Sequence, residues 1–137
     1  MPLPSIQPFP PDCPPEDAQP VSGVFYRLVG KHLGVGDSTD ESSWLRPYQT
    51  QGSQYYKTFD AVGAHGLSVF ADLADTRRAR GIAPWMAKKS VAEVTVTEAE
   101  GSMRPSPTAV STSHHDWWTH PVDLQPSGIV IEAGMES

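Results

Sequence analysis

The chain has 137 residues and a formal net charge of −6, and only 19% of its residues are charged. This length is typical of one domain with a single hydrophobic core. Nucleic-acid binding depends on a basic surface that neutralises phosphates. A chain with this acidic net charge is therefore not expected to have a nucleic-acid partner. The 14 prolines and 11 glycines favour short elements that are joined by long irregular connections.

Cysteine content and hydropathy indicate the cellular compartment that we expect for the protein. The single cysteine, Cys13, cannot form an internal disulfide, which fits a reducing compartment. The sequence has no run of about 18 apolar residues and no basic segment followed by an apolar one at its start. We therefore expect a soluble, cytoplasmic protein that does not contact a membrane.

Residues 1–20 contain eight prolines and no basic residue. Because proline fixes φ and lacks a backbone donor, this arm is predicted to be extended and to lie outside any sheet. One interpretation is a flexible leader, and the other is an arm that packs over the domain through Ile6 and Phe9. We expect residues 21–137 to form the folded domain and the arm to be dispensable for folding.

Four segments have the composition of strands. Residues 21–29 are rich in aromatic and β-branched side chains, and in residues 90–98 apolar and polar side chains alternate. The alternation predicts one buried and one solvated face, which is typical of an antiparallel sheet. Two shorter apolar runs, at residues 67–70 and 129–132, complete the predicted sheet.

Residues 71–89 have helical composition, with Asp72 or Asp75 able to cap the start. Because Gly81 and Pro84 interrupt the segment, we expect one helix over about residues 75–80 and a second short turn from Pro84. Its basic residues are interpreted as a solvated charged face. They are Arg77, Arg78, Arg80, Lys88 and Lys89. The predicted fold class is α+β: a small, mainly antiparallel sheet with one or two short helices and long loops.

Two loops carry side chains of interest. Tyr55, Tyr56 and Phe59 suggest a short apolar contact surface within a polar connection. Residues 103–113, rich in Pro, Ser and Thr, are predicted to be a loop that leads into the segment 113–121. That segment contains three of the five histidines and two of the four tryptophans of the chain.

Several short motifs occur in an order that resembles a group of small uncharacterised bacterial proteins. The motifs are Phe25-Tyr26-Arg27, residues 42–47, residues 66–69, residues 91–96, the His-Asp-Trp-Trp run and residues 129–132. The shared features are a Tyr-Arg start, a Leu-Ser-Val strand and a late histidine segment before the last strand. The resemblance covers most of residues 24–132. It implies one compact domain in which Arg27, Ser68 and the histidine segment converge, but no particular activity.

A metal site is one hypothesis for the histidine segment. His114, His115 and His120 could ligate a divalent metal together with Asp116 if the segment curls. However, adjacent histidines on a strand point to opposite sides, and the spacing matches no standard zinc signature.

A second hypothesis is an NAD-dependent site. Arg27, then Ser111-Thr112-Ser113, then Glu132 resemble the Arg, Ser-Thr-Ser, Glu series of the ADP-ribosyltransferase superfamily. The resemblance implies that the arginine holds phosphate, the serines brace the site and the glutamate supports ribose chemistry. The chain departs from that pattern in two ways. Only 18 residues separate Ser113 from Glu132, and Val130 stands where the family has Glu or Gln.

The leading interpretation is a binding domain that engages a protein partner or a small ligand through a His/Trp-rich surface. The residues expected at this surface are Trp117, Trp118, His120, Arg27, Tyr26 and Trp44. A competing interpretation places both adjacent tryptophans in the core. The alternative function is an enzyme whose polar cleft is built from Arg27, Ser68 and residues 114–120. Its catalytic candidates are His114, His115, Asp116, Arg27, Ser68 and Glu132. The sequence does not indicate an oligomeric state.

Overall fold

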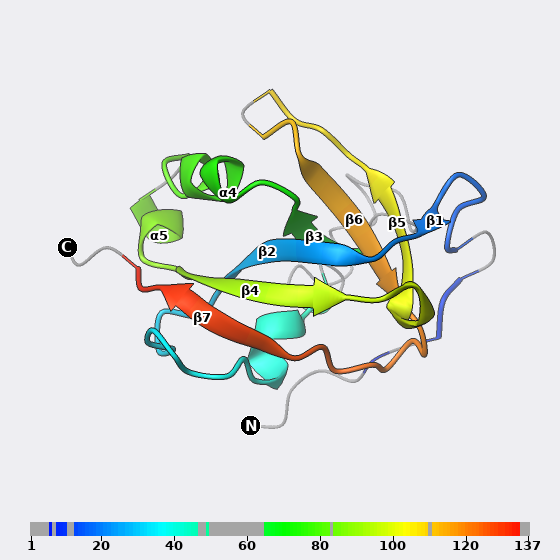
Figure 1. The fold of residues 1–137 in the computed structure, drawn as a ribbon, viewed down its shortest axis with the longest axis horizontal. Helices are drawn as coiled ribbons and strands as arrows, with labels where there is room; N and C mark the ends of the chain where they lie inside the picture. Colours follow the sequence, from blue (N-terminus) through cyan, green and yellow to red (C-terminus); the bar gives the residue numbers. More distant parts are fainter. Residues whose placement is uncertain are drawn as a thin grey trace.

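The computed structural model describes residues 6, 8–10, 13–46, 49, 65–82, 84–109 and 111–134, with only the backbone at Trp85. In the part of the chain that the structure describes, seven strands form one antiparallel sheet, accompanied by short α-helices and 3-10 turns (Figure 1). The predicted α+β class with a small antiparallel sheet is confirmed. Among the described residues, none of the helices has the length and apolar character that a membrane span needs.

The sheet has the strand order β1-β5-β6-β3-β2-β4-β7. The strands are β1 (Gln19–Pro20), β2 (Gly23–Val29), β3 (Leu67–Phe70), β4 (Ser90–Val96), β5 (Gly101–Pro105), β6 (His114–Thr119) and β7 (Gly128–Glu132). Strands β2, β3, β4 and β7 confirm the four predicted from composition and alternation, with bounds that differ by at most two residues. In β4, the buried residues alternate with exposed Glu93 and Thr95, as expected.

The predicted loop over residues 103–113 is wrong at its start, because β5 extends to Pro105. The histidine segment is also a strand: β6 pairs with β3 on one side and with β5 on the other. Histidine, aspartate and proline are poor indicators of a strand. Here the pairing on both sides and the burial of Trp117 and Trp118 decide the conformation.

The two helices are α4 (Leu73–Ala79) and α5 (Pro84–Ala87). Helix α4 begins two residues before the predicted start, because the Ala74 backbone N–H donates to Asp72 Oδ1 at 2.7 Å and caps the first turn. Helix α5 begins at proline, as predicted. Two 3-10 turns, η1 (Glu41–Trp44) and η3 (Glu98–Glu100), complete the regular elements described here.

The sheet divides into two parts between β2 and β3. These strands pair at a single position, Tyr26 with Phe70, whereas β2 pairs with β4 along its whole length. Figure 1 shows β2, β4 and β7 running together, with β5 and β6 crossing them at a steep angle. The main core cluster joins the two parts. It consists of Phe25, Val94 and Val96 from one part, Leu67, Val69, Met103 and Trp117 from the other, and Trp44 of η1.

Strands β1 and β7 form the edges of the sheet. Gln19 and Pro20 pair with Met103 and Ser102, so the expectation that no residue of the arm joins a sheet is wrong at its last two residues. Proline fits here because an edge strand needs backbone donors on one side only. At the other edge, residues 36–39 bond to β7: the backbone N–H of Gly36 donates to the Val130 carbonyl and that of Val130 to the Asp37 carbonyl, both at 2.9 Å.

The rest of the arm contacts the domain through Asp17, whose carboxylate lies 3.7 Å from Arg104 Nη1, and through Phe9. The ring of Phe9 meets the buried His65 ring edge to face, with 6.2 Å between the centroids. This contact agrees with the interpretation of an arm that packs over the domain. The predicted surface of Tyr55, Tyr56 and Phe59 lies outside the described residues.

Two truncations separate the contributions of the arm. We expect removal of residues 1–12 to lower the free energy of unfolding by less than about 1 kcal/mol, because it removes mainly the Phe9–His65 contact. Removal of residues 1–20 deletes β1 as well and should cost roughly 1 kcal/mol more. Urea unfolding of both truncations measures the difference. Equal stability of the two would contradict a contribution from the β1–β5 pairing.

Gly101 is predicted to be irreplaceable where β5 begins. Its φ is +131°, and an added Cβ would collide with the Trp118 carbonyl oxygen and lie 2.9 Å from Thr119 Cα. Because both obstacles are backbone, Gly101→Ala should lower the free energy of unfolding by about 2–4 kcal/mol. Gly36→Ala is the matched control: its φ is +91° but no atom lies within 4 Å of the added Cβ. It should cost roughly 1 kcal/mol, and comparable losses in chemical unfolding would refute the role of the collision.

Candidate functional site

Arg27 lies where β2 and β3 separate, and its guanidinium bonds to backbone carbonyls. It donates to the carbonyl oxygens of Ser43 (2.6 Å), Ser68 (2.8 Å) and Leu45 (3.1 Å). Its Cζ lies 5.5 Å from the centroid of the Trp44 ring. Burial, and secondarily the charge of Arg46, lower the pKa of Arg27 to about 10, so the group stays protonated near pH 7. These contacts give Arg27 a structural role in place of the predicted catalytic or ligand-binding one.

The residues of the predicted polar site that lie on β6 point to opposite faces of the sheet. In the register of β3 and β6, Asp116 lies opposite Ser68, and His115 lies opposite Val69. Since side chains alternate along a strand, His114 and Asp116 share one face with Ser68, whereas His115 points to the other. His115 packs edge to face on Phe25, with 5.7 Å between the ring centroids. The predicted cleft of Arg27, Ser68 and residues 114–120 is therefore not formed as one surface.

Both neighbouring imidazoles are held by backbone carbonyls. His114 Nδ1 donates to the Ser106 carbonyl at 2.8 Å, and His115 Nδ1 donates to the Ser113 carbonyl at 2.7 Å. His120 is exposed beyond the end of β6. Within the part of the chain that the structure describes, no group of three or more His, Cys, Asp or Glu side chains could hold a metal ion. The metal hypothesis for His114, His115 and His120 thus finds no support in the geometry.

The three tryptophans expected at a binding surface are buried. Trp44 and Trp117 are each 1% exposed, and Trp118 is 0% exposed. Trp44 and Trp117 meet edge to face with 6.1 Å between the centroids, and Arg104 lies over the Trp118 ring at 5.3 Å. The prediction of surface anchors is wrong for these residues, because adjacent indoles on β6 point into opposite, covered faces. Their burial supports the competing interpretation of core residues.

Tyr26 remains partly exposed. It lies opposite Phe70 on β3 and Glu93 on β4, so its side chain is on the face of the sheet away from that of Arg27. These two predicted binding residues therefore do not belong to one surface.

The series that suggested NAD chemistry does not converge either. Glu132 accepts two hydrogen bonds from Arg77 Nε, at 2.9 and 3.1 Å. Ser113 is used at the start of α4, where its backbone N–H donates to Asp75 Oδ2 at 2.8 Å. Arg27 bonds to carbonyls in the separation between β2 and β3. Each part of the series thus makes a different internal contact.

One pocket includes the end of the histidine segment. It has a volume of about 340 Å³, and the proline-rich arm contributes to its wall. Its lining residues are Phe9, Pro14, Pro20, Glu98, Ala99, Gly101, Ser102, Trp118, Thr119 and His120. This arm pocket is the place where two of the predicted binding residues, Trp118 and His120, come together.

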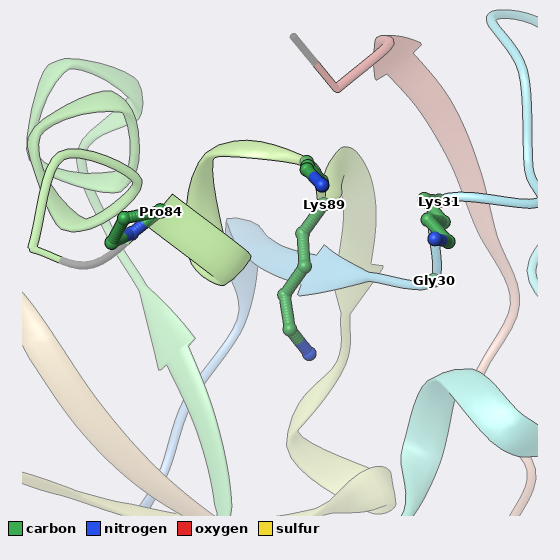
Figure 2. Close-up of a pocket in the computed structure, with 5 residues that line it drawn as sticks. Gly30, Lys31, Pro84 and Lys89 are labelled. Carbon is green, nitrogen blue, oxygen red and sulfur yellow. The ribbon is translucent and has the colours of Figure 1, made fainter. Parts of the chain in front are cut away.

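A larger pocket, of about 680 Å³, lies between the end of β2 and the connection from α5 to β4. We call it the lysine pocket, because its described lining consists of Gly30, Lys31, Pro84, Lys88 and Lys89. In Figure 2, the Lys89 side chain runs between Pro84 on one side and Gly30 and Lys31 on the other. The pairing of Val29 with Ser90 brings these two chain segments together.

Hydrogen bonds fix both walls of the lysine pocket. On one side, the Leu33 N–H donates to the Gly30 carbonyl at 3.2 Å, and the buried Ser90 Oγ donates to the Leu33 carbonyl at 2.7 Å. On the other side, the Lys89 backbone N–H donates to the Met86 carbonyl at 3.1 Å. The turn after β2 and the connection from α5 to β4 are therefore held by hydrogen bonds next to the pocket.

The lysine pocket is electropositive in an acidic chain. Lys31 and Lys88 are exposed at its rim, whereas Lys89 is partly buried. Burial lowers the pKa of Lys89, and the positive charge of Arg27 lowers it further. Lysines from two separate segments thus line one cavity, and their positive charges suit an anionic ligand.

Sequence reasoning missed this site because it assigned Lys88 and Lys89 to a solvated helix face. The paired lysines follow a proline-initiated turn and directly precede a strand, and Lys31 directly follows another strand. Knowledge that these two strands pair would have revealed the site. That pairing joins residues about 60 positions apart and has no local signature.

Comparisons of the chain with protein-family models, with curated proteins and with solved structures gave no match.

The structural role of Arg27 can be tested by substitution. We expect Arg27→Met to lower the free energy of unfolding by about 3 kcal/mol, because it leaves enclosed carbonyl oxygens without donors. Arg77→Met is the control: it removes a surface ion pair with Glu132 and should cost less than about 1 kcal/mol. Chemical unfolding measures both. A loss for Arg27→Met no larger than that for Arg77→Met would show that the carbonyl contacts contribute little.

Proposed function

We propose that this protein is a small-ligand-binding domain and that its ligand carries a carboxylate or phosphate group, which enters the lysine pocket. The observation that carries the proposal is the convergence of Lys31, Lys88 and Lys89 on one cavity in a chain of net charge −6. In so acidic a protein, a cluster of cations around a pocket provides local attraction for an anion.

The size and lining of the pocket favour a small molecule. Its volume of about 680 Å³ lies within the range of roughly 300–1,000 Å³ that is usual for small-molecule sites. Pro84 and the aliphatic stems of the lysines supply apolar contact. A ligand with a compact organic body and one anionic end matches these walls.

The two exposed lysines should hold the anionic group of the ligand. Lys31 and Lys88 are exposed, so their ammonium groups can meet an anion that keeps part of its hydration. Burial and the positive charge of Arg27 lower the pKa of Lys89 and disfavour its ammonium form, so Lys89 contributes less to anion binding.

The proposal keeps the binding class expected from the sequence and moves the surface from the His/Trp segment to the lysine pocket. A cytoplasmic location remains part of the proposal and rests on the single Cys13. An enzyme built on Arg27, Ser68 and residues 114–120 is not proposed, because their side chains belong to different faces of the sheet.

The arm pocket is a second candidate for ligand binding, since His120 and Trp118 both line it. Glu98 supplies a carboxylate there, and Phe9 with two prolines supplies apolar walls. We propose a neutral or cationic ligand for this pocket. His120→Ala should weaken the binding of such a ligand and leave anion binding at the lysine pocket unchanged. The variant therefore distinguishes the two sites experimentally.

Anion binding at the lysine pocket can be measured as a shift in thermal stability. A ligand that binds only the folded state at 100 times its Kd stabilises it by about 2.7 kcal/mol. We expect inorganic phosphate, and separately citrate, to raise the unfolding midpoint of the wild-type protein at low ionic strength. Lys88→Gln should reduce the shift, because it removes one rim ammonium group.

Arg77→Gln is the charge-matched control, since the Arg77 guanidinium faces Glu132 and does not line the lysine pocket. It should retain the phosphate-induced shift. An equal reduction in both variants would mean that phosphate responds to overall charge and not to the pocket. No shift with either anion, in the wild-type protein, would contradict the proposed function.

A further inference from the structure

Lys89 differs from the two rim lysines in its surroundings. Lys31 and Lys88 are exposed, whereas Lys89 is partly buried within the cavity that all three line. Figure 2 shows the extended Lys89 side chain reaching into the space between Pro84 and the turn at Gly30 and Lys31. One partly buried lysine and two exposed lysines thus line the same cavity.

This environment favours the neutral, nucleophilic form of the Lys89 amine. Burial disfavours an ammonium ion, and the positive charge of Arg27 disfavours it further, so the pKa of Lys89 is lowered. Lysines that are desolvated or lie near another cation are the ones that react with carbonyl compounds near neutral pH. Lys31 and Lys88 lack this enclosure and serve as internal references in the same chain.

We propose that Lys89 forms a reversible imine with the carbonyl group of a small anionic aldehyde or α-keto acid bound in the lysine pocket. The inference rests on the proposed function, because the anionic group of that ligand would be held by the rim lysines. Lys31 and Lys88 are exposed, whereas Lys89 is partly buried in the lining of the same pocket, so an anion held by the exposed lysines places the rest of the ligand near Lys89.

The reaction is balanced without an oxidant or a cofactor. The Nζ lone pair attacks the carbonyl carbon and forms a C–N bond, and the carbonyl oxygen becomes the hydroxyl of a carbinolamine. One nitrogen proton moves to that oxygen as the carbinolamine forms, and the hydroxyl then leaves with the second nitrogen proton, as water, which gives the neutral imine. Protonation of the imine nitrogen gives an iminium ion, and addition of water reverses every step.

The test traps the imine with a hydride donor and locates it. The wild-type protein is incubated at pH 7.5 with glyoxylate and cyanoborohydride, and modified lysines are identified by peptide mass spectrometry over time. We expect Lys89 to be modified at least about fivefold faster than Lys31 or Lys88, because the neutral fraction of a solvated lysine is very small at this pH. Inorganic phosphate should slow modification at Lys89 more than at the other two.

Two matched variants and a neutral reagent sharpen the result. Lys89→Arg keeps the positive charge but removes the amine, so it should abolish fast labelling and retain the phosphate-induced thermal shift. Arg77→Gln lies outside the pocket and keeps all three lysines, so it should retain fast labelling of Lys89. Propanal has a carbonyl group but no charge, and with it the preference for Lys89 should fall at least about threefold.

The outcomes separate this inference from the proposed function. A phosphate-induced thermal shift without faster labelling of Lys89 would overturn the imine and leave anion binding intact. Fast labelling of Lys89 with no thermal shift and no protection by phosphate would contradict the anion-binding function and leave a reactive lysine. Equal selectivity with glyoxylate and propanal would overturn the assignment of an anionic carbonyl ligand.

Discussion

The structure depends on the backbone contacts of one partly buried cation, Arg27. Strand β2 separates from β3 after a single residue pair, so backbone carbonyls near the separation need donors from elsewhere. Arg27 supplies them: three nitrogens of its guanidinium bond to carbonyls of Ser43, Leu45 and Ser68. A lysine could not reach all three with the same fixed geometry. The fork shape of arginine therefore lets the sheet bend around its core while the η1 segment stays attached.

The same cation links the fold to the candidate site. The field of Arg27 acts on Lys89, which lies at the start of β4, next to the strand that carries Arg27. A positive group that is needed for backbone contacts thus also tunes an amine in the lysine pocket. A substitution of Arg27 is therefore expected to change both the stability of the fold and the charge around Lys89. A substitution that spared stability would still alter the electrostatics of the pocket.

Local sequence patterns were sufficient to predict part of this fold. The alternation in β4, the aromatic and β-branched run in β2 and the acidic cap of α4 are readable because each depends on nearby residues. Strands β5 and β6 were not readable, since Pro105 and the His-His-Asp run resemble a loop until their partners are known. The histidine segment was predicted to form the site because it is dense in polar and aromatic side chains. In the strand, however, these side chains alternate between the two faces of the sheet. The lysines of the pocket meet only through the pairing of β2 with β4.

The two ends of the sheet have a consequence for how the protein behaves among copies of itself. An exposed edge strand is a template on which another chain can add a strand and begin aggregation. At one edge, β1 is two residues long and includes Pro20, which has no N–H to offer. At the other, residues 36–39 exchange backbone hydrogen bonds with β7 and occupy its outer side. A chain whose described fold is mostly sheet is thereby protected against edge-to-edge polymerisation, and it should tolerate the high concentrations at which unprotected sheets form fibrils.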